Sequence, residues 1–99
     1  MKTNIQINET SMTIAIEGRL DSLTAPDLQA ELEKYNLVEL TEIVLDLEKL
    51  EYISSAGLRV LLQTFRSMKP GGVLRIINAN EITRKVFEVT GFESFFKIE

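Results

Sequence analysis

A change of hydrophobic period between residues 42 and 77 limits the fold more than any other feature of this chain. Glu42–Leu47 is apolar and β-branched, as expected of a central strand buried on both faces, and only Asp46 interrupts it. From Ser55 onward apolar residues recur at helical spacing until Pro70–Gly72 ends the pattern, and the apolar Val73–Ile77 follows. A strand, a helix and a strand in this order predict a right-handed crossover and an α/β fold.

Alternating apolar residues predict two further strands near the N-terminus. Asn4–Ile7 and Met12–Gly18 each alternate with period two, and the polar Asn8–Ser11 between them favours a turn. These segments predict an N-terminal hairpin. Thr24 has the chemistry of a helix cap, and the helix that it opens has an apolar face made of Ala25, Leu28, Leu32 and Tyr35.

The C-terminal quarter predicts one more helix and a short strand. Asn80 is expected to cap the helix and Gly91 to end it. A short last strand is expected within Phe95–Ile98. The inward face of the helix is expected to consist of Ile82, Val86 and Val89. The core beneath it is expected to be closed by Phe87, Phe92, Phe95 and Phe96.

These elements predict one domain over residues 1–99, a length that closes a core without disulfides or metals. The expected fold is α/β, with a mixed four- to five-stranded sheet. It starts with the hairpin and continues with alternating helices and strands, and the helices pack on the sheet. No internal repeat, linker or low-complexity segment interrupts the pattern.

The residue inventory excludes several classes of function. With neither cysteine nor histidine, the chain has no thiolate nucleophile, no disulfide framework and no Ser–His or Cys–His catalytic pair. The net charge of −4 comes without a basic cluster, so binding to nucleic acid or to an anionic membrane surface is not expected. Met1–Asn4 lacks the apolar run of a signal peptide and no segment is long enough to span a membrane, so we expect a cytoplasmic protein that does not insert into membranes.

The polar segment that joins the central strand to the long helix carries the distinctive chemistry. It runs from Glu48 to Leu58 and contains two adjacent serines. At the carboxyl ends of strands in α/β sheets, the first N–H groups of the next helix have no intrahelical acceptor. An attached phosphate is favoured there by on the order of 0.3–1 kcal/mol, so phosphorylation is expected to leave the fold intact. From spacing alone, however, Ser55 is most simply a helix cap.

Three segments of the chain resemble the STAS family of anti-sigma factor antagonists. Ile43–Leu47 followed by Ile53–Leu58 is similar to the family's V-L-D-L strand and D-S-x-G-L motif. Gly18–Ala25 resembles its earlier G-x-L-D-x-x-T-A segment, and Val86–Phe92 resembles its closing helix and turn. These motifs occur at the family's intervals and span most of the chain. One departure is Ser54, where many members carry aspartate before the acceptor serine.

The resemblance implies a binding module rather than an enzyme. In the family, the unphosphorylated domain binds an ATP-binding anti-sigma factor serine kinase and thereby frees a sigma factor. The kinase then phosphorylates the motif serine, and a metal-dependent serine phosphatase reverses the modification. Alignment with the motif makes Ser55 the acceptor, while Ser54 offers a neighbouring hydroxyl and is expected to be the cap. No cofactor is implied, and a monomer or weak dimer is expected.

The docking surface is expected to surround the acceptor serine. In the family the Gly18–Ala25 segment lies beside the phosphorylation loop, and the helix face formed by Ala56, Val60, Gln63 and Ser67 is expected to project away from the core as a flat patch. Asp46 is expected near the Ser55 loop, either bracing it through backbone N–H groups or contacting the partner. The expected partner-binding residues are Asp21, Ser22, Thr24, Asp46, Ser54, Ala56, Gly57, Val60 and Gln63.

Other classes of function follow from the same residues. STAS-like domains also serve as non-switching scaffolds in signalling or lipid-transport assemblies, where Ser55 would be only a cap. Weak nucleotide binding is a further class, although no Gly-rich phosphate loop is present. A serine hydrolase is excluded because Ile53–Gly57 lacks the first glycine of G-x-S-x-G and no histidine exists to activate the serine. No metal site is expected, since nothing fixes a common coordination geometry for Glu31, Glu33, Glu48 and Glu51.

Overall fold

In a computed structural model that describes residues 1–99, helices and strands alternate after an N-terminal hairpin, as the sequence predicts. The elements are β1 (Lys2–Asn8), β2 (Ser11–Leu20), α1 (Ala25–Leu32), β3 (Glu42–Asp46), β4 (Leu50–Ile53), α2 (Ser55–Ser67), β5 (Val73–Ile77), α3 (Glu81–Thr90) and β6 (Lys97–Ile98). Short 3₁₀ turns lie at Leu37–Glu39 and Phe92–Ser94.

The strands form one mixed sheet in the order β1-β2-β3-β5-β6, with β4 paired to β2 outside this path. β1 and β2 are antiparallel, and every other pair is parallel. The predicted hairpin and α/β class are therefore confirmed. The sheet has one strand more than the four to five predicted, because β4 is only four residues long and lies inside the polar segment between β3 and α2.

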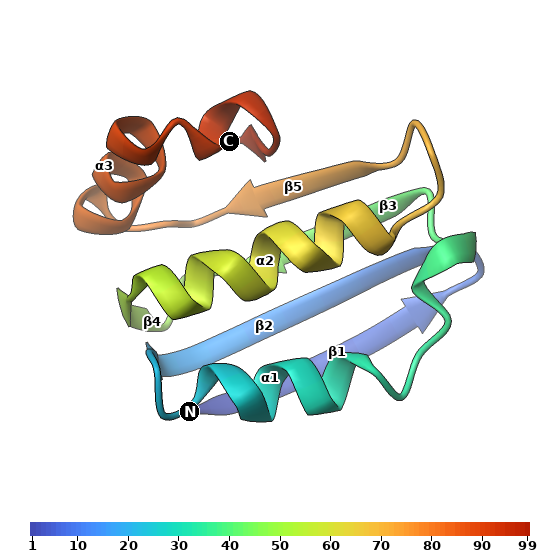
Figure 1. The fold of residues 1–99 in the computed structure, drawn as a ribbon, viewed down its shortest axis with the longest axis horizontal. Coiled ribbons are helices and arrows are strands. Elements are labelled where there is room, and N and C mark those ends of the chain that lie inside the picture. Colours follow the sequence, from blue (N-terminus) through green and yellow to red (C-terminus); the bar gives the residue numbers. More distant parts are fainter.

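Only one face of the sheet is covered by helices. α1 and α2 both lie in front of the strands in Figure 1. The strand order advances from β2 to β3 to β5 in one direction. The crossovers from β2 to β3 and from β3 to β5 are both expected to be right-handed, so they place α1 and α2 on the same side of the sheet. On this side β2 buries Met12, Ile14 and Ile16 almost completely. The prediction that β3 is buried on both faces is wrong, since Val44 and Asp46 on the other face are only half-buried.

Ion pairs rather than a helix stabilise the uncovered face. Arg75 on β5 donates from Nη2 to Glu99 Oε1 over 2.8 Å and from Nη1 to Glu42 Oε2 over 3.2 Å. The hydrogen bonds to Glu99 and Glu42 raise the pKa of Arg75. The same contacts from Arg75 hold the pKa of the Glu99 carboxyl below its ordinary value. The polar groups at this end of the open face are therefore mutually paired.

The face that α3 presents to the core matches the predicted one only in part. Its cap and stop are as expected, because the Asn80 side chain accepts from the Thr83 N–H over 2.8 Å and Gly91 has a φ of 76°. Val86 is half-buried against the core, as expected. Ile82 and Val89 are exposed by 71% and 69%, however, and the fully buried residues are Thr83 and Phe87. The helix lies at the edge of the molecule in Figure 1, so only a narrow stripe of it contacts the core.

A cluster of phenylalanines joins α3 to α2 and β6. Phe96 packs edge-on against Phe87, Phe92 and Phe65, with ring centroids about 6 Å apart. Phe87 and Phe96 are buried and Phe92 is half-buried, as predicted. Phe95 stays 43% exposed at the rim of the cluster, so its predicted place in the core is wrong. None of the three helices has the length and apolar character needed to cross a bilayer.

Candidate functional site

Ser55 is the first residue of α2 and lies on the surface. β4 carries the chain to this point, since Ile53 pairs with Leu20 at the end of β2 and the Ser54 N–H donates to the Leu20 carbonyl over 2.9 Å. The side chain of Ser54 caps the helix by accepting from the Gly57 N–H over 3.3 Å, as the sequence predicts. The Ser55 hydroxyl forms no hydrogen bond within the molecule and is exposed.

Gly57 holds α2 against the end of β2. A Cβ at this position would lie 2.7 Å from Leu20 Cγ and 2.9 Å from the Leu20 carbonyl oxygen, closer than folded chains tolerate. Gly57 is also buried. Its expected role as a partner-binding residue is therefore corrected: the residue has no surface to offer, and its lack of a side chain allows the helix to approach the strand.

The loop between β2 and α1 is held by the Asp21 carboxylate. Asp21 Oδ1 accepts from the N–H groups of Leu23 over 3.0 Å and Thr24 over 3.1 Å, and Arg19 lies 3.6 Å from Oδ2. Partial desolvation raises the pKa of Asp21, but these hydrogen bonds, the Thr24 hydroxyl and the Arg19 charge outweigh it. The pKa therefore lies below its ordinary value. Asp21 is half-buried and serves mainly to shape the loop.

Thr24 does not cap α1 through its side chain, contrary to the prediction. Its hydroxyl donates instead to the Arg19 carbonyl over 2.8 Å and accepts from the Asp21 N–H over 2.9 Å. These contacts turn the side chain back into the loop. The neighbouring Ser22 is exposed and faces α2, where it lines a hollow of about 160 Å³ together with Ala56 and Gln63.

Val60 lies between the two helices and not on an exposed patch. It is only 6% exposed, because α1 covers this flank of α2. The predicted flat patch with an exposed valine is therefore wrong. Ala56 is half-buried, and Gln63 and Ser67 are exposed as expected. The charged residue beside them, Arg59, is also exposed and lines the same hollow as Ser22, although the sequence analysis did not single it out.

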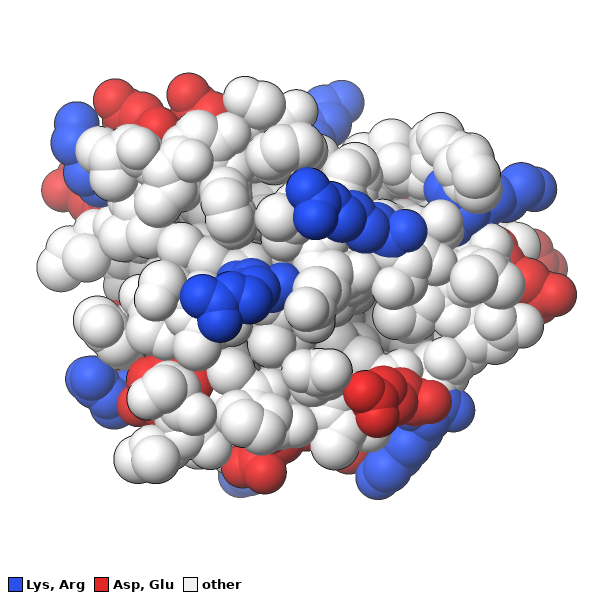
Figure 2. Space-filling view, in the orientation of Figure 1, with Lys and Arg blue, Asp and Glu red and all other residues white.

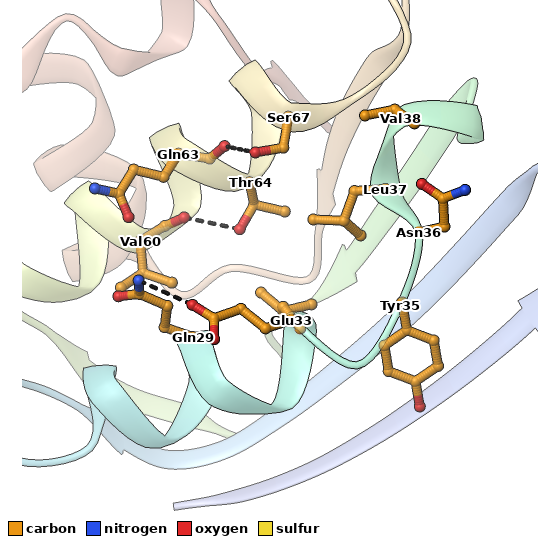
Figure 3. A pocket seen from close by; sticks show the side chains of 11 residues that line it. Gln29, Glu33, Tyr35, Asn36, Leu37, Val38, Val60, Gln63, Thr64 and Ser67 are labelled. Atoms are coloured by element: carbon orange, nitrogen blue, oxygen red, sulfur yellow. Dashed lines mark hydrogen bonds between the residues drawn. The ribbon is translucent and has the colours of Figure 1, made fainter.

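A groove runs between α1 and α2 from the Ser55 end towards the 3₁₀ turn at Leu37–Glu39. Its main part has a volume of about 310 Å³ and shares Gln29, Val60 and Gln63 with the smaller hollow. In Figure 3 the side chains of Gln29 and Glu33 lie along the α1 side of the groove, joined by a hydrogen bond of 3.3 Å. No sequence pattern indicates this groove, since its walls come from segments about thirty residues apart.

Asp46 braces the start of the segment that leads to Ser55, which is one of the two predicted roles, but it lies away from Ser55 itself. It is in register with Ala15 of β2, whereas Ile53 is in register with Leu20, five positions further along, or about 16 Å at the rise of a strand. Asp46 Oδ1 accepts from the Glu48 N–H and from Asn78 Nδ2, each over 3.1 Å. It therefore braces the connection from β3 to β4 on the open face of the sheet.

The charge on the helical face is basic along α2. The only charged residues of this helix are Arg59 and Arg66, and neither forms an ion pair. Figure 2, in the same orientation as Figure 1, shows this face largely uncharged, with separate basic side chains near its middle and acidic ones towards the rim. No group of three or more acidic side chains is arranged to hold a metal ion.

Comparisons with known proteins by sequence and by structure both find anti-sigma factor antagonists. The family model described as the STAS domain matches residues 2–99. BtrV of Bordetella bronchiseptica, named as a candidate anti-sigma factor antagonist, is 34% identical over 99% of this chain and 85% of its own. The anti-sigma-B factor antagonist of Bacillus subtilis is 31% identical over 99% of this chain and 92% of its own.

Solved structures of the anti-sigma factor antagonist SpoIIAA share the fold. The unphosphorylated form superposes with a TM-score of 0.77 at 19% identity, covering 99% of this chain and 87% of that one. The phosphorylated form from Bacillus gives 0.75 at 20% identity, covering 99% and 91%. At about 20% identity, this structural similarity shows a shared fold and nothing more.

Proposed function

This chain belongs to the STAS domain family of anti-sigma factor antagonists, and we propose that it acts as a phosphorylation-controlled docking module whose acceptor is Ser55. Residues 1–99 act as a single STAS domain without cofactor or catalytic activity of its own. The module works in the cytoplasm as a monomer or weak dimer. It does not bind nucleic acid or insert into a membrane.

One observation carries this proposal. Two serines lie side by side at the start of α2, and only Ser54 is engaged in holding the helix. The Ser55 hydroxyl is exposed and free of hydrogen bonds, so a phosphate added there breaks no contact of the fold. The positive end of α2 stabilises the added charge. A modification at Ser55 therefore alters the surface and leaves the domain folded.

The partner in the unmodified state is an anti-sigma factor serine kinase, which is removed from its sigma factor by binding this surface. The contact surface consists of the Ser55 end of α2, the exposed Ser22 of the β2–α1 loop, and the outer residues Ala56 and Gln63. Asp21, Thr24 and Ser54 support it from behind by fixing the loop and the helix start. A metal-dependent serine phosphatase returns the modified module to its binding state.

Phosphate switches binding off through charge and hydration. It adds close to two negative charges to a contact that docking removes from water. A penalty of about 3 kcal/mol lowers affinity roughly a hundredfold.

The test compares variants at the two serines. Ser55→Ala is expected to bind the cognate kinase as tightly as the unmodified chain by isothermal titration calorimetry, and Ser55→Glu to bind far more weakly. Ser54→Ala is the matched control, since it removes a neighbouring hydroxyl and retains the acceptor. Mass spectrometry after incubation with the kinase and ATP is expected to locate one phosphate at Ser55. Equal affinities for Ser55→Ala and Ser55→Glu would indicate a non-switching scaffold instead.

A further inference from the structure

Arg59 is the unpaired cation nearest in sequence to the proposed acceptor. Three of the other four arginines are engaged within the fold: Arg19 pairs with Asp21, Arg75 with Glu99 and Glu42, and Arg84 donates to the Glu99 carbonyl. The guanidinium of Arg59 forms no ion pair or hydrogen bond with the rest of the chain. Acidic residues outnumber basic ones by 15 to 11, yet no carboxylate of the chain pairs with Arg59.

The spacing of Ser55 and Arg59 places them on one face of α2. Residues four apart on a helix have Cβ atoms about 5–6 Å from each other. Side chains on a helix tilt towards its N-terminus, so the long side chain of Arg59 extends back towards Ser55. Arg59 also lines the hollow that contains Ser22 and Ala56. A phosphate on Ser55 would therefore form within reach of the guanidinium.

We propose that Arg59 transmits the modification: the unmodified chain offers its guanidinium to a carboxylate of the partner, and a phosphate on Ser55 takes it into an intramolecular ion pair. This rests on the proposed function, in which Ser55 is the acceptor. Guanidinium binds phosphate and carboxylate through the same two parallel hydrogen bonds, so one replaces the other directly. Phosphorylation then removes a docking cation as well as adding a repulsive anion.

The partner chemistry follows from the charge of α2. The helix has two arginines and no acidic residue, which suits an acidic surface and not a basic one. Arg66 lies eleven residues after Ser55, about three helical turns away, and is exposed like Arg59. It has the same charge in the same helix without the reach to Ser55. Arg66→Gln is therefore a matched control for Arg59→Gln.

The first experiment needs no partner. Phosphoserine is installed at position 55 of the full chain, and the second ionisation of the phosphate is followed by ³¹P NMR as pH is raised. A nearby cation favours the dianion, so Arg59→Gln is expected to raise the pKa of the phosphate by about 0.3 pH units and Arg66→Gln to leave it unchanged. The effect of Arg59 is expected to shrink in 1 M salt. Identical pKa values in the parent and Arg59→Gln chains would overturn the ion pair.

The second experiment measures the partner contact. For unphosphorylated chains, Arg59→Gln is expected to weaken kinase binding about five- to tenfold and Arg66→Gln less than twofold. The ratio of affinities with and without phosphate is expected to be smaller in Arg59→Gln, because no docking cation remains to be captured. Equal weakening by both substitutions would overturn the role of Arg59 in docking. If the kinase does not bind any form, the proposed function fails, and the NMR titration still decides whether the ion pair forms.

Discussion

The open face of the sheet and the Ser55 end of α2 both expose polar and charged side chains, but they differ in how these are paired. On the open face Arg75 is held by two carboxylates, and Asp46 accepts from a side chain and a backbone N–H. At the start of α2 the Ser55 hydroxyl and the Arg59 guanidinium have no partner within the chain. Polar groups of the first region complete the fold, whereas those of the second are available to another molecule.

Gly57 offers the strongest way to disturb the Ser55 end. Gly57→Val is expected to lower the free energy of unfolding by about 2–3 kcal/mol, because the added carbons meet Leu20 at distances below 3 Å. Urea denaturation followed by circular dichroism measures this. The control is Ala30→Val on the exposed side of α1, which is expected to cost less than about 1 kcal/mol. Similar losses for the two variants would show that α2 does not depend on close approach to β2.

Substitutions at the two adjacent serines are expected to have the next largest effect on the free energy of unfolding. Ser54→Ala is expected to lower the free energy of unfolding by about 1 kcal/mol, since it removes the cap hydrogen bond to the Gly57 N–H. Ser55→Ala is expected to change it by less than about 0.5 kcal/mol. Chemical denaturation of both variants in the same buffer tests the difference. A larger loss from Ser55→Ala would mean that Ser55 is structural and would remove the contrast between the regions.

The two arginines test the same contrast with smaller effects. Arg75→Gln is expected to lower Tm modestly, because it leaves Glu99 and Glu42 without their shared partner. Arg59→Gln is expected to leave Tm unchanged, since its guanidinium forms no ion pair or hydrogen bond in the fold. Differential scanning calorimetry at low and high salt compares them. A fall in Tm from Arg59→Gln that matches the fall from Arg75→Gln would show that Arg59 stabilises the isolated chain.

The dependence of stability on pH gives the smallest effect. Asp21 and Glu99 have pKa values below their ordinary ones, so the folded chain binds fewer protons than the unfolded chain near pH 4. Their contribution is present above the ordinary carboxyl pKa values and is lost as pH falls through the lowered ones. Tm is therefore expected to fall as pH drops below about 4.5, and to fall less steeply in Arg75→Gln. Parallel profiles for the parent and this variant would contradict the role of Glu99.

Features that depend on a few neighbouring residues were predictable from the sequence. The Ser54 cap, the Asn80 cap and the Gly91 stop each rest on contacts within four residues, and all three are present. Thr24 is the exception among the caps. Its hydroxyl has a competing acceptor in the Arg19 carbonyl, and this competition depends on how the β2–α1 loop folds.

The faces of the helices that have neighbours were predicted wrongly at several positions. Val60 was expected on the surface because it lies off the main apolar stripe of α2, but α1 packs on that flank. Ile82 and Val89 were expected inside because their spacing is helical, yet α3 lies at the edge of the molecule and turns them outward. A periodic pattern shows which residues share a face of a helix and does not show which faces have neighbours.

The sequence by itself determined the α/β class, the ends of most helices, the lack of residues for Ser–His or Cys–His catalysis, and the pair of serines at the start of α2. These follow from composition and from interactions along one stretch of chain. Only the tertiary structure decided that both crossover helices cover one face, that Asp46 lies about 16 Å along the sheet from the Ser55 end, and that Arg59 is left unpaired beside Ser22. The physical reason is that these relations join segments distant in sequence, and the order and register of the strands alone set their positions.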